Sequence, residues 1–371
     1  MSRGALTLAL FGALAVATAA GSSVQPPGSL TQLAGTAGCI DYNGDDHCSA
    51  THKLGTLGTL LLSPDGRFMY MGIDFGTLVF QRDPATGELK RVAGPGGCLS
   101  LPQGASGSGC TRMSGVYYGN PITSISPDGT TAYAAGELAQ GAYFTPSIIG
   151  FHRDQATGAL TQFADPPVCI PSSQSGKCIA AKNLFGFAPF VSLDGKNVYL
   201  RLQAGIWSFE RDPSTGALTA LPDAQGCIKD PIFLPKLNLG CAVGRAVYSP
   251  SGIAESPDGR NVYVSSVEGG ISVFSRDSTT GALVQLPGQE GCIGTTAILK
   301  GSCAPGRGLE EATDVAVSPD GRNVYAVSAR LINATAPLSH ALSIFRRDPA
   351  TGALTQLPGQ EGCVNDRGFS G

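Results

Sequence analysis

A repeat of about 64 residues predicts an all-β fold, a β-propeller of four-stranded antiparallel blades. The turn Ser-Pro-Asp-Gly, or Ser-Leu-Asp-Gly in one copy, recurs at spacings of 63, 66, 64 and 62 residues, starting at Ser63, Ser126, Ser192, Ser256 and Ser318. Each copy continues to a Phe-X-Arg-Asp sequence and a Thr-Gly turn. Since no segment has an apolar period of 3.6 residues long enough for 10–15-residue helices, helical repeats are excluded.

The fourth repeat shows the expected strands most clearly. A first strand ends near Glu255, and the following turn has Pro at its second position and Gly at its fourth, as a type I turn favours. The segment 261–265 alternates apolar and polar residues, which is typical of a half-buried strand. The segments 271–274 and 282–286 complete the four strands.

Five complete units are expected, within a propeller domain of residues 21–371. They lie near 57–93, 120–164, 185–221, 250–286 and 312–357. Residues 28–33 match a fourth, outer strand that no first three strands precede. We interpret this as a truncated reading frame of a six- or seven-bladed ring. The alternative is a five-bladed ring with a spare strand and a free thiol at Cys363.

The composition limits the possible partners. The chain has 25 Lys and Arg against 28 Asp and Glu, a net charge of −3, which argues against nucleic acid as a partner. Residues 1–20 have the Arg3 n-region, an apolar stretch and an Ala-X-Ala site that predict a cleaved signal peptide. We therefore expect a secreted or periplasmic protein without a membrane span after cleavage.

The cysteines predict local disulfides, because eleven of them lie in an exported chain of low charge. Their spacing does not contain the C-x₂₋₄-C knuckles of structural zinc sites. Each short loop would stabilise the fold by roughly 2–3 kcal/mol. The predicted pairs are Cys39–Cys48, Cys98–Cys110, Cys169–Cys178, Cys227–Cys241 and Cys292–Cys303, with Cys363 left over.

The repeat resembles the blades of the bacterial YVTN/lactonase-like propeller superfamily. The resemblance is carried by SPDGRNVYVSS (256–266), ISVFSRDSTTGALVQLPG (271–288) and SPDGRNVYAVS (318–328), and it extends over residues 28–363. It implies a seven-bladed scaffold and, for the lactonase members, hydrolysis of cyclic esters at one end of the central channel. The Pro-Arg-His and Asn-Glu segments expected of 6-phosphogluconolactonase-like members do not occur here.

Residues that recur in every unit are interpreted as structural. The Asp of the Phe-X-Arg-Asp sequence is expected to accept backbone N–H groups in an Asx turn, and the Arg to cover the blade edge with its head in water. The recurring tyrosines Tyr70, Tyr133, Tyr199, Tyr263 and Tyr325 are expected to pack between blades, and the single Trp207 to fill the core.

Residues that differ between units are the candidate site. The loop between second and third strands is expected to be long in unit 2 (136–147) and unit 5 (329–340), on the face that also holds the cysteine loops. Near the end of each second strand lies one charged residue. These candidate ligand-binding residues are Asp74, Glu137, Arg201, Glu268 and Arg330.

The predicted function is a secreted binding or scaffold protein that recognises a small polar ligand, a glycan or a protein on this face. The alternative is a lactonase-type hydrolase, with Asp74, Glu137 or Glu268 as general base. No catalytic motif of the G-x-S-x-G or H-E-x-x-H type is present, so no catalytic residue is assigned. No cofactor or metal is expected, because a calcium loop starting at Asp41 would have Asp46 where Gly is needed and His52 where Glu is needed.

Overall fold

The computed structural model describes thirteen segments of the chain. They are 30–41, 48–50, 57–73, 76–101, 109–114, 118–140, 143–164, 168–169, 186–231, 240–267, 269–295, 301–329 and 340–365. The predicted signal peptide and most of the loop containing Asp41–Asp46 lie outside these residues. No helix in the described segments is long and apolar enough to cross a membrane.

The described strands form five large sheets, here called blades 1 to 5. Blade 1 contains β3 (Leu57–Leu62), β4 (Phe68–Ile73), β5 (Gly76–Arg82), β6 (Leu89–Arg91), β7 (Cys98–Ser100) and β8 (Thr111–Arg112). Blade 2 contains β9 (Tyr118–Ile125), β10 (Thr131–Gln140), β11 (Tyr143–Arg153), β12 (Leu160–Gln162) and β13 (Val168–Cys169). Blade 3 contains β14 (Gly186–Val191), β15 (Asn197–Leu202), β16 (Gly205–Arg211), β17 (Leu218–Ala220), β18 (Cys227–Lys229) and β19 (Ala242–Val243), with α1 (Asp223–Gly226) between β17 and β18.

The last two blades repeat this order. Blade 4 contains β20 (Pro250–Glu255), β21 (Asn261–Ser266), β22 (Gly270–Arg276), β23 (Leu283–Gln285), β24 (Cys292–Gly294) and β25 (Ala304–Pro305). Blade 5 contains β26 (Ala312–Val317), β27 (Asn323–Ala329), β28 (His340–Arg347), β29 (Leu354–Gln356) and β30 (Cys363–Asn365). A two-stranded parallel sheet of β1 (Ile40–Asp41) and β2 (Ser49–Ala50) precedes them.

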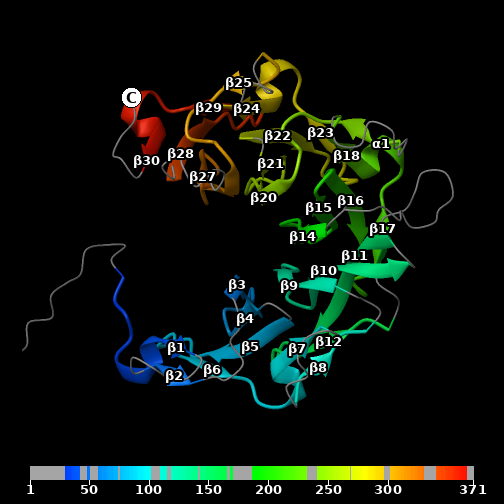
Figure 1. The fold of residues 1–371 in the computed structure, drawn as a ribbon, viewed down its shortest axis with the longest axis vertical. Helices are drawn as coiled ribbons and strands as arrows, with labels where there is room; N and C mark the ends of the chain where they lie inside the picture. Colours follow the sequence, from blue (N-terminus) through cyan, green and yellow to red (C-terminus); the bar gives the residue numbers. More distant parts are fainter. Residues whose placement is uncertain are drawn as a thin grey trace, which may run out of the picture.

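The blades stand around a common centre, which confirms the predicted all-β propeller. In Figure 1 the first strands β3, β9, β14 and β20 lie nearest the centre and the later strands lie at the periphery. The blades follow one another in sequence order along an arc, which is open between the blue N-terminal segment and the red blade 5. Apolar side chains from adjacent blades share one core cluster, as Tyr199 and Ile206 do with Val262 and Phe274.

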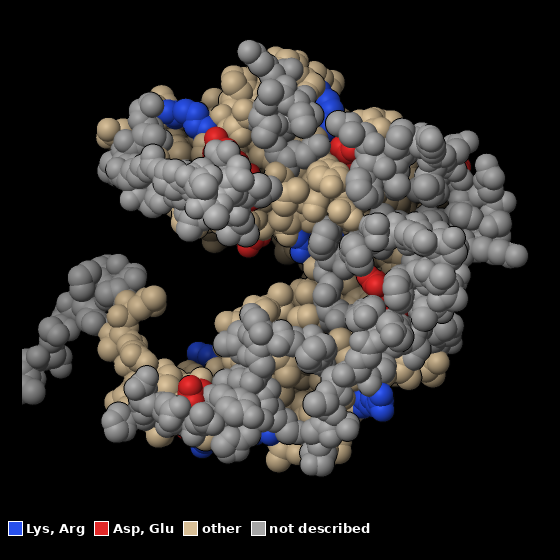
Figure 2. All heavy atoms as spheres, in the orientation of Figure 1, with Lys and Arg blue, Asp and Glu red and all other residues tan. Residues whose placement is uncertain are grey.

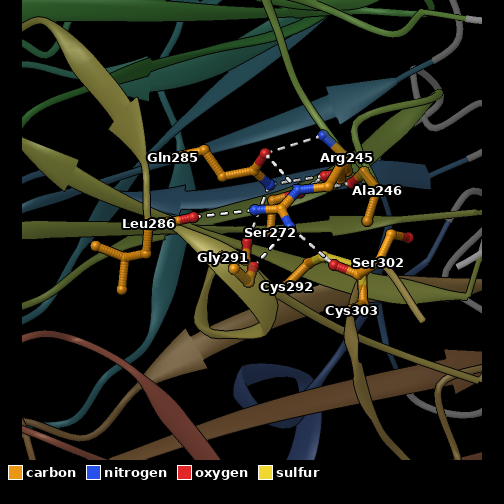
Figure 3. The surroundings of a disulfide bond; sticks show 10 residues. Arg245, Ala246, Ser272, Gln285, Leu286, Gly291, Cys292, Ser302 and Cys303 are labelled. Carbon is orange, nitrogen blue, oxygen red and sulfur yellow. Dashed lines mark hydrogen bonds between the residues drawn. A yellow bond between two sulfur atoms is a disulfide. The ribbon is translucent and has the colours of Figure 1, made fainter. Parts of the chain in front are cut away.

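The outer strand of each blade is divided into two short pieces. In blade 4, β23 pairs with the second half of β22, and β24 pairs with its first half, so Cys292 begins a strand. Figure 3 shows how Arg245 secures this break: its guanidinium donates to the carbonyl oxygens of Leu286, at 3.0 Å, and Ser302, at 2.8 Å. The first cysteine of this disulfide loop therefore begins a strand of the sheet.

Disulfides close these segments as predicted. The structure contains Cys39–Cys48, Cys98–Cys110, Cys227–Cys241 and Cys292–Cys303. Cys169 is also disulfide-bonded, and Cys178 lies outside the described residues. Cys363 is a buried free thiol. It opposes Ser343 of β28 just as Cys292 opposes Ser272 of β22.

Successive blades are joined by a repeated polar cluster, here called the inter-blade cluster. In the one between blades 2 and 3, Arg211 Nε donates to the Tyr133 hydroxyl at 3.0 Å and Nη2 donates to Asp128 at 3.0 Å. The Tyr133 hydroxyl donates to the carbonyl of Gly216 at 2.7 Å. The other three clusters consist of Arg153 with Tyr70 and Asp65, Arg276 with Tyr199 and Asp194, and Arg347 with Tyr263 and Asp258.

These clusters confirm that four of the five tyrosines, Tyr70, Tyr133, Tyr199 and Tyr263, pack between blades, whereas Tyr325 of blade 5 is half-buried and belongs to no such cluster among the described residues. The clusters also correct the expectation for the arginines. The side chain of Arg211 is 0% exposed, so its head does not lie in water. The reason is that its donors are satisfied by the preceding blade, which the local sequence does not reveal. The predicted Asx turns are present: the Asp277 carboxylate accepts the backbone N–H groups of Thr279 and Thr280, each at 2.8 Å. Trp207 is buried in the core as expected.

Two local predictions were wrong. The segment 136–147 was expected to be a long loop, but β10 and β11 stay paired as far as Gln140 and Tyr143, so it is an extended hairpin. Residues 28–33 were expected to be a strand, but residues 30–33 are not in a strand, because no third strand lies beside them to accept their hydrogen bonds.

The first prediction concerns the inter-blade cluster. Replacing Arg211 by Met is expected to lower the free energy of unfolding by about 3 kcal/mol, because it leaves Tyr133 and Asp128 without their buried partner. The matched control is Arg82→Met, since Arg82 donates only to Gly66 of its own blade among the described residues. Urea unfolding followed by circular dichroism measures both. Equal losses in the two variants would contradict the role given to the cluster.

The second prediction concerns acid stability. Burial alone would raise the pKa of Asp128, but hydrogen bonds from Ser126 and Thr130 and the charge of Arg211 outweigh it and hold the pKa at about 2. The pKa values of Asp65, Asp194 and Asp258 are lowered for similar reasons. Because these carboxyls are more acidic when folded, their stabilisation is present above pH 4 and is lost as the pH falls toward 2.

Thermal unfolding between pH 6 and pH 2 measures this effect. The melting temperature should fall steeply below about pH 4, and the fall should be shallower in Asp128→Asn. Asp320→Asn, in the exposed turn of blade 5, is the control. A pH profile that is identical in the two variants would argue against the ion pairs as its source.

Candidate functional site

Two of the five predicted ligand-binding residues, Glu137 and Arg201, can be placed in the structure. Asp74, Glu268 and Arg330 lie outside the described residues. Glu137 pairs with Tyr118 of β9 and Pro146 of β11. Arg201 pairs with Ala188 of β14 and Ile206 of β16. Both residues therefore lie in the last part of a second strand, on the face where that strand turns into the third.

The two side chains lie in different inter-blade spaces. Side chains alternate along a strand, so Glu137 is on the same side as Tyr133 and Arg201 on the same side as Tyr199. Tyr133 contacts blade 3, through Gly216, and Tyr199 contacts blade 4, through Gly281. Glu137 thus faces blade 3 and Arg201 faces blade 4, so the structure does not bring them together.

Arg201 has an incompletely satisfied side chain. Its Nε is buried and has no hydrogen-bond partner among the described residues. Burial lowers the pKa of Arg201 to about 10, and the negative charge of Asp314 opposes the change, so the guanidinium is positive at neutral pH. Since burying an unpaired N–H donor costs free energy, this atom is available to an acceptor from a ligand.

Gln203 is the second group of this site, and the sequence alone did not indicate it. It lies in the turn directly after β15, and its buried Oε1 also has no partner in the described segments. The Gln203 carbonyl accepts the backbone N–H of Ser249 at 2.8 Å, and the Ser249 carbonyl accepts that of Val267. These bonds link the turn after β15 to blade 4. Arg201 and Gln203 are therefore two residues apart in the sequence, at the place where blade 3 is linked to blade 4.

Asp314 of β26 provides the opposing charge. Its Oδ1 accepts the N–H of Val315 at 2.9 Å, and the residue is exposed. A Cβ added to Gly252 would lie 2.5 Å from Asp314 Oδ1, so a glycine is required where β20 passes between Asp314 and blade 3. The polar groups here are thus the half-buried Arg201, an amide oxygen without a partner among the described residues, and a carboxylate on the far side of β20.

Glu137 is a second, separate candidate. It is 8% exposed, and burial raises the pKa of its carboxyl. The contrast is Glu255, whose carboxylate accepts the N–H of Leu193 at 2.7 Å and pairs with Arg276. Burial raises the pKa of both carboxyls, and Glu255 has these structural partners in addition.

Other features of the described residues do not form a site for chemistry. A cavity of about 160 Å³ between blades 2 and 3 is lined mainly by apolar groups, including Ile148, Phe163 and Leu218, and contains neither Glu137 nor Arg201. No group of three His, Cys, Asp or Glu side chains suited to a metal ion occurs within the described segments. Figure 2 shows that the hollow of the arc is bordered mostly by uncharged atoms, with isolated charged side chains at its edge.

Comparison with known proteins gives no close relative. No family model and no curated protein match the sequence. A candidate 6-phosphogluconolactonase from Bacteroides uniformis has a similar structure, with 19% identity and a TM-score of 0.48 over 80% of this chain and 69% of that one. The periplasmic gluconolactonase PpgL of Pseudomonas aeruginosa is similar at 16% identity and a TM-score of 0.48, over 81% of this chain and 73% of that one. A functionally unknown protein from Desulfotomaculum acetoxidans gives 13% identity and a TM-score of 0.46, over 83% and 74%.

Proposed function

We propose that this propeller binds a small hydroxy acid at the junction of blades 3 and 4. The observation that carries the proposal is a pair of buried polar atoms without a partner among the described residues, Arg201 Nε at the end of β15 and Gln203 Oε1 in the turn that follows it. A carboxylate accepts hydrogen bonds from a guanidinium, and a hydroxyl donates to an amide oxygen. A molecule with both groups satisfies both atoms, and a purely apolar or cationic ligand satisfies neither.

The proposed setting is outside the cytoplasm. Disulfides persist in oxidising compartments, and four pairs are closed in the described segments. Together with the predicted signal peptide at residues 1–20, they support a secreted or periplasmic protein. The ligand would then be a molecule present in that space, which fits a small soluble acid.

Lactone hydrolysis is the second candidate function, and Glu137 is the observation that favours it. A buried carboxyl with a raised pKa suits a general base that activates water. The proteins of similar structure from Bacteroides uniformis and Pseudomonas aeruginosa are named for gluconolactone chemistry, which makes sugar-acid lactones the first substrates to test. Opening such a lactone yields a hydroxy acid, the class of ligand proposed for Arg201.

The third prediction tests binding at Arg201. Calorimetric titration with gluconate should show binding that Arg201→Met weakens by about 10- to 100-fold, since one charge-assisted hydrogen bond contributes about 1.5–3 kcal/mol. Arg260→Met, at an exposed position of blade 4, should bind as the unchanged protein does. Glucose, which lacks the carboxylate, should bind no better to the unchanged protein than to Arg201→Met. If Arg201→Met binds gluconate normally, the site is elsewhere.

The fourth prediction tests hydrolysis. If Glu137 is a general base, turnover of glucono-lactone should rise with pH as its carboxyl loses the proton, and Glu137→Gln should lower kcat/KM by about 10²- to 10⁴-fold. Glu210→Gln, at an exposed position of blade 3, is the control. If the protein binds gluconate but does not turn over the lactone, hydrolysis is excluded and binding remains as the function.

A further inference from the structure

The cavity of about 160 Å³ between blades 2 and 3 lies where blade 2 covers the next blade incompletely. One of its lining residues is Leu218, the first residue of β17, which is half-buried. The leucines at the same position of blades 2, 4 and 5 are Leu160, Leu283 and Leu354, and they are only 4%, 3% and 7% exposed. Blades 1, 3 and 4 therefore cover this leucine of the following blade, whereas blade 2 leaves space beside it.

Gly150 of β11 is one reason for this space. It pairs with Tyr133 and has no side chain to direct toward blade 3. Its counterpart Val273 pairs with Tyr263 in blade 4 and belongs to the same core cluster as Leu354 of blade 5. The residues at this position of the other four repeats all have a side chain, and they are Val79, Ser208, Val273 and Ile344. Blade 2 thus lacks the group that fills the contact with the next blade.

The outer-strand piece β13 is also placed differently in blade 2. Cys169 pairs with the residue four positions before the Phe of the Phe-X-Arg-Asp sequence, whereas Cys292 in blade 4 pairs with the residue two positions before it. As a result the half-buried Val168 lies opposite Ile148, where blade 4 has the buried Ile293 opposite its own isoleucine. The smaller valine adds to the space that the glycine leaves.

Phe163 forms an aromatic wall of the cavity and is held in place there. A Cβ added to Gly150 would lie 2.2 Å from Phe163 Cε2, and one added to Gly216 would lie 2.8 Å from Phe163 Cζ. The ring therefore lies against the backbones of two glycines, one in each blade. The ring of Tyr133 is a second wall, and its centroid is 6.4 Å from that of Phe163 with the two planes at 89°.

The polar side chains of the lining already have partners. The Tyr133 hydroxyl donates to the Gly216 carbonyl at 2.7 Å and accepts from Arg211 Nε at 3.0 Å. The Gln162 amide accepts the N–H of Ser114 and donates to its carbonyl, both at 2.9 Å. No charged side chain is among the described residues that line the cavity. Because a charged ligand would lose its hydration here without replacement, the lining favours a neutral, apolar occupant.

We propose that this cavity binds a small neutral aromatic molecule with a single ring. Its volume is close to that of an engineered apolar cavity of about 150 Å³ that holds benzene. Since the two aromatic walls are perpendicular, a third ring can stack on one of them while it meets the other edge-to-face, and both are favoured geometries. Ala217 is exposed at the edge of the cavity, so the cavity is open to solvent there.

This site is independent of the function proposed for Arg201. Arg201 faces blade 4, whereas the cavity lies between blades 2 and 3. A bound ring would cover Leu218 as the side chains of the preceding blade cover Leu283 and Leu354. Because the ligand would bind the folded blades and not the unfolded chain, it should also stabilise the protein.

The fifth prediction uses toluene as the probe. Toluene should raise the melting temperature, and in methyl NMR spectra it should shift the signals of Ile148, Val168 and Leu218 but not that of Leu354. Methylcyclohexane, which is similar in size but has no aromatic ring, should bind about threefold or more weakly. Benzoate should bind at least about tenfold more weakly, since burying its carboxylate in an apolar cavity is costly.

Two variants that reduce the cavity locate the binding. Gly150→Val combined with Phe163→Leu gives blade 2 the residues that blade 4 has at these positions, and it should weaken toluene binding by at least about tenfold. Ala217→Leu adds a side chain at the exposed edge without changing the core, and it should also weaken binding. Ala350→Leu, in the corresponding exposed turn of blade 5, is the matched control and should bind toluene normally.

Several results would overturn the proposal. Toluene that does not bind, or that binds equally well to both cavity variants, would show that the cavity is not a ligand site. Methylcyclohexane or benzoate binding as tightly as toluene would contradict the ligand class. If the double variant does not fold, Ala217→Leu alone decides, and normal toluene binding by that variant would refute the site.

Discussion

The fold depends on burying one arginine between each pair of adjacent blades. Removing a guanidinium from water is costly unless nearly all its donors are paired, and here the pairing comes from two blades at once. Arg276 reaches the Gly259 carbonyl of its own blade, and Tyr199 and Asp194 of the blade before it. The tyrosine in turn donates to a Gly carbonyl in the Thr-Gly turn that follows the arginine. Each blade therefore supplies the acceptors for the arginine of the next blade, always in the same order along the chain.

This requirement accounts for much of the recurring sequence. The Asp of the Ser-Pro-Asp-Gly turn shapes that turn and also binds the next blade's arginine, as Asp258 does with Arg260 N and Arg347. The glycine after Thr351 brings the backbone so close to Asn261 that an added Cβ would lie 2.1 Å from its Nδ2. The recurring residues are thus needed for the contacts between blades. Function must come from residues that the repeat does not need.

The sequence predicts the strands and the radial repeat well, because period-two alternation and turn residues are local signals. The contacts of the arginines could not be predicted, because their partners are 77 residues or more away in the chain, as Tyr199 is from Arg276. The length of the β10–β11 hairpin was missed because residues 136–147 lack alternating polarity. For the candidate site, residue type indicated Glu137 and Arg201. They lie in two different inter-blade spaces because each is on the tyrosine side of its own strand and therefore faces the next blade, and the contacts of these tyrosines are not a local signal.

Two buried arginine donors of blade 3 differ in how completely they are paired. Arg211 and Arg201 are both arginines of blade 3 with buried donors, yet Arg211 bonds to five groups of two blades, whereas Arg201 Nε bonds to none of the described residues. A propeller blade that only had to fold would gain stability from an apolar side chain at position 201, because an unpaired buried donor is unfavourable. The retention of a charged group at a place where the fold does not use it is what a ligand would explain.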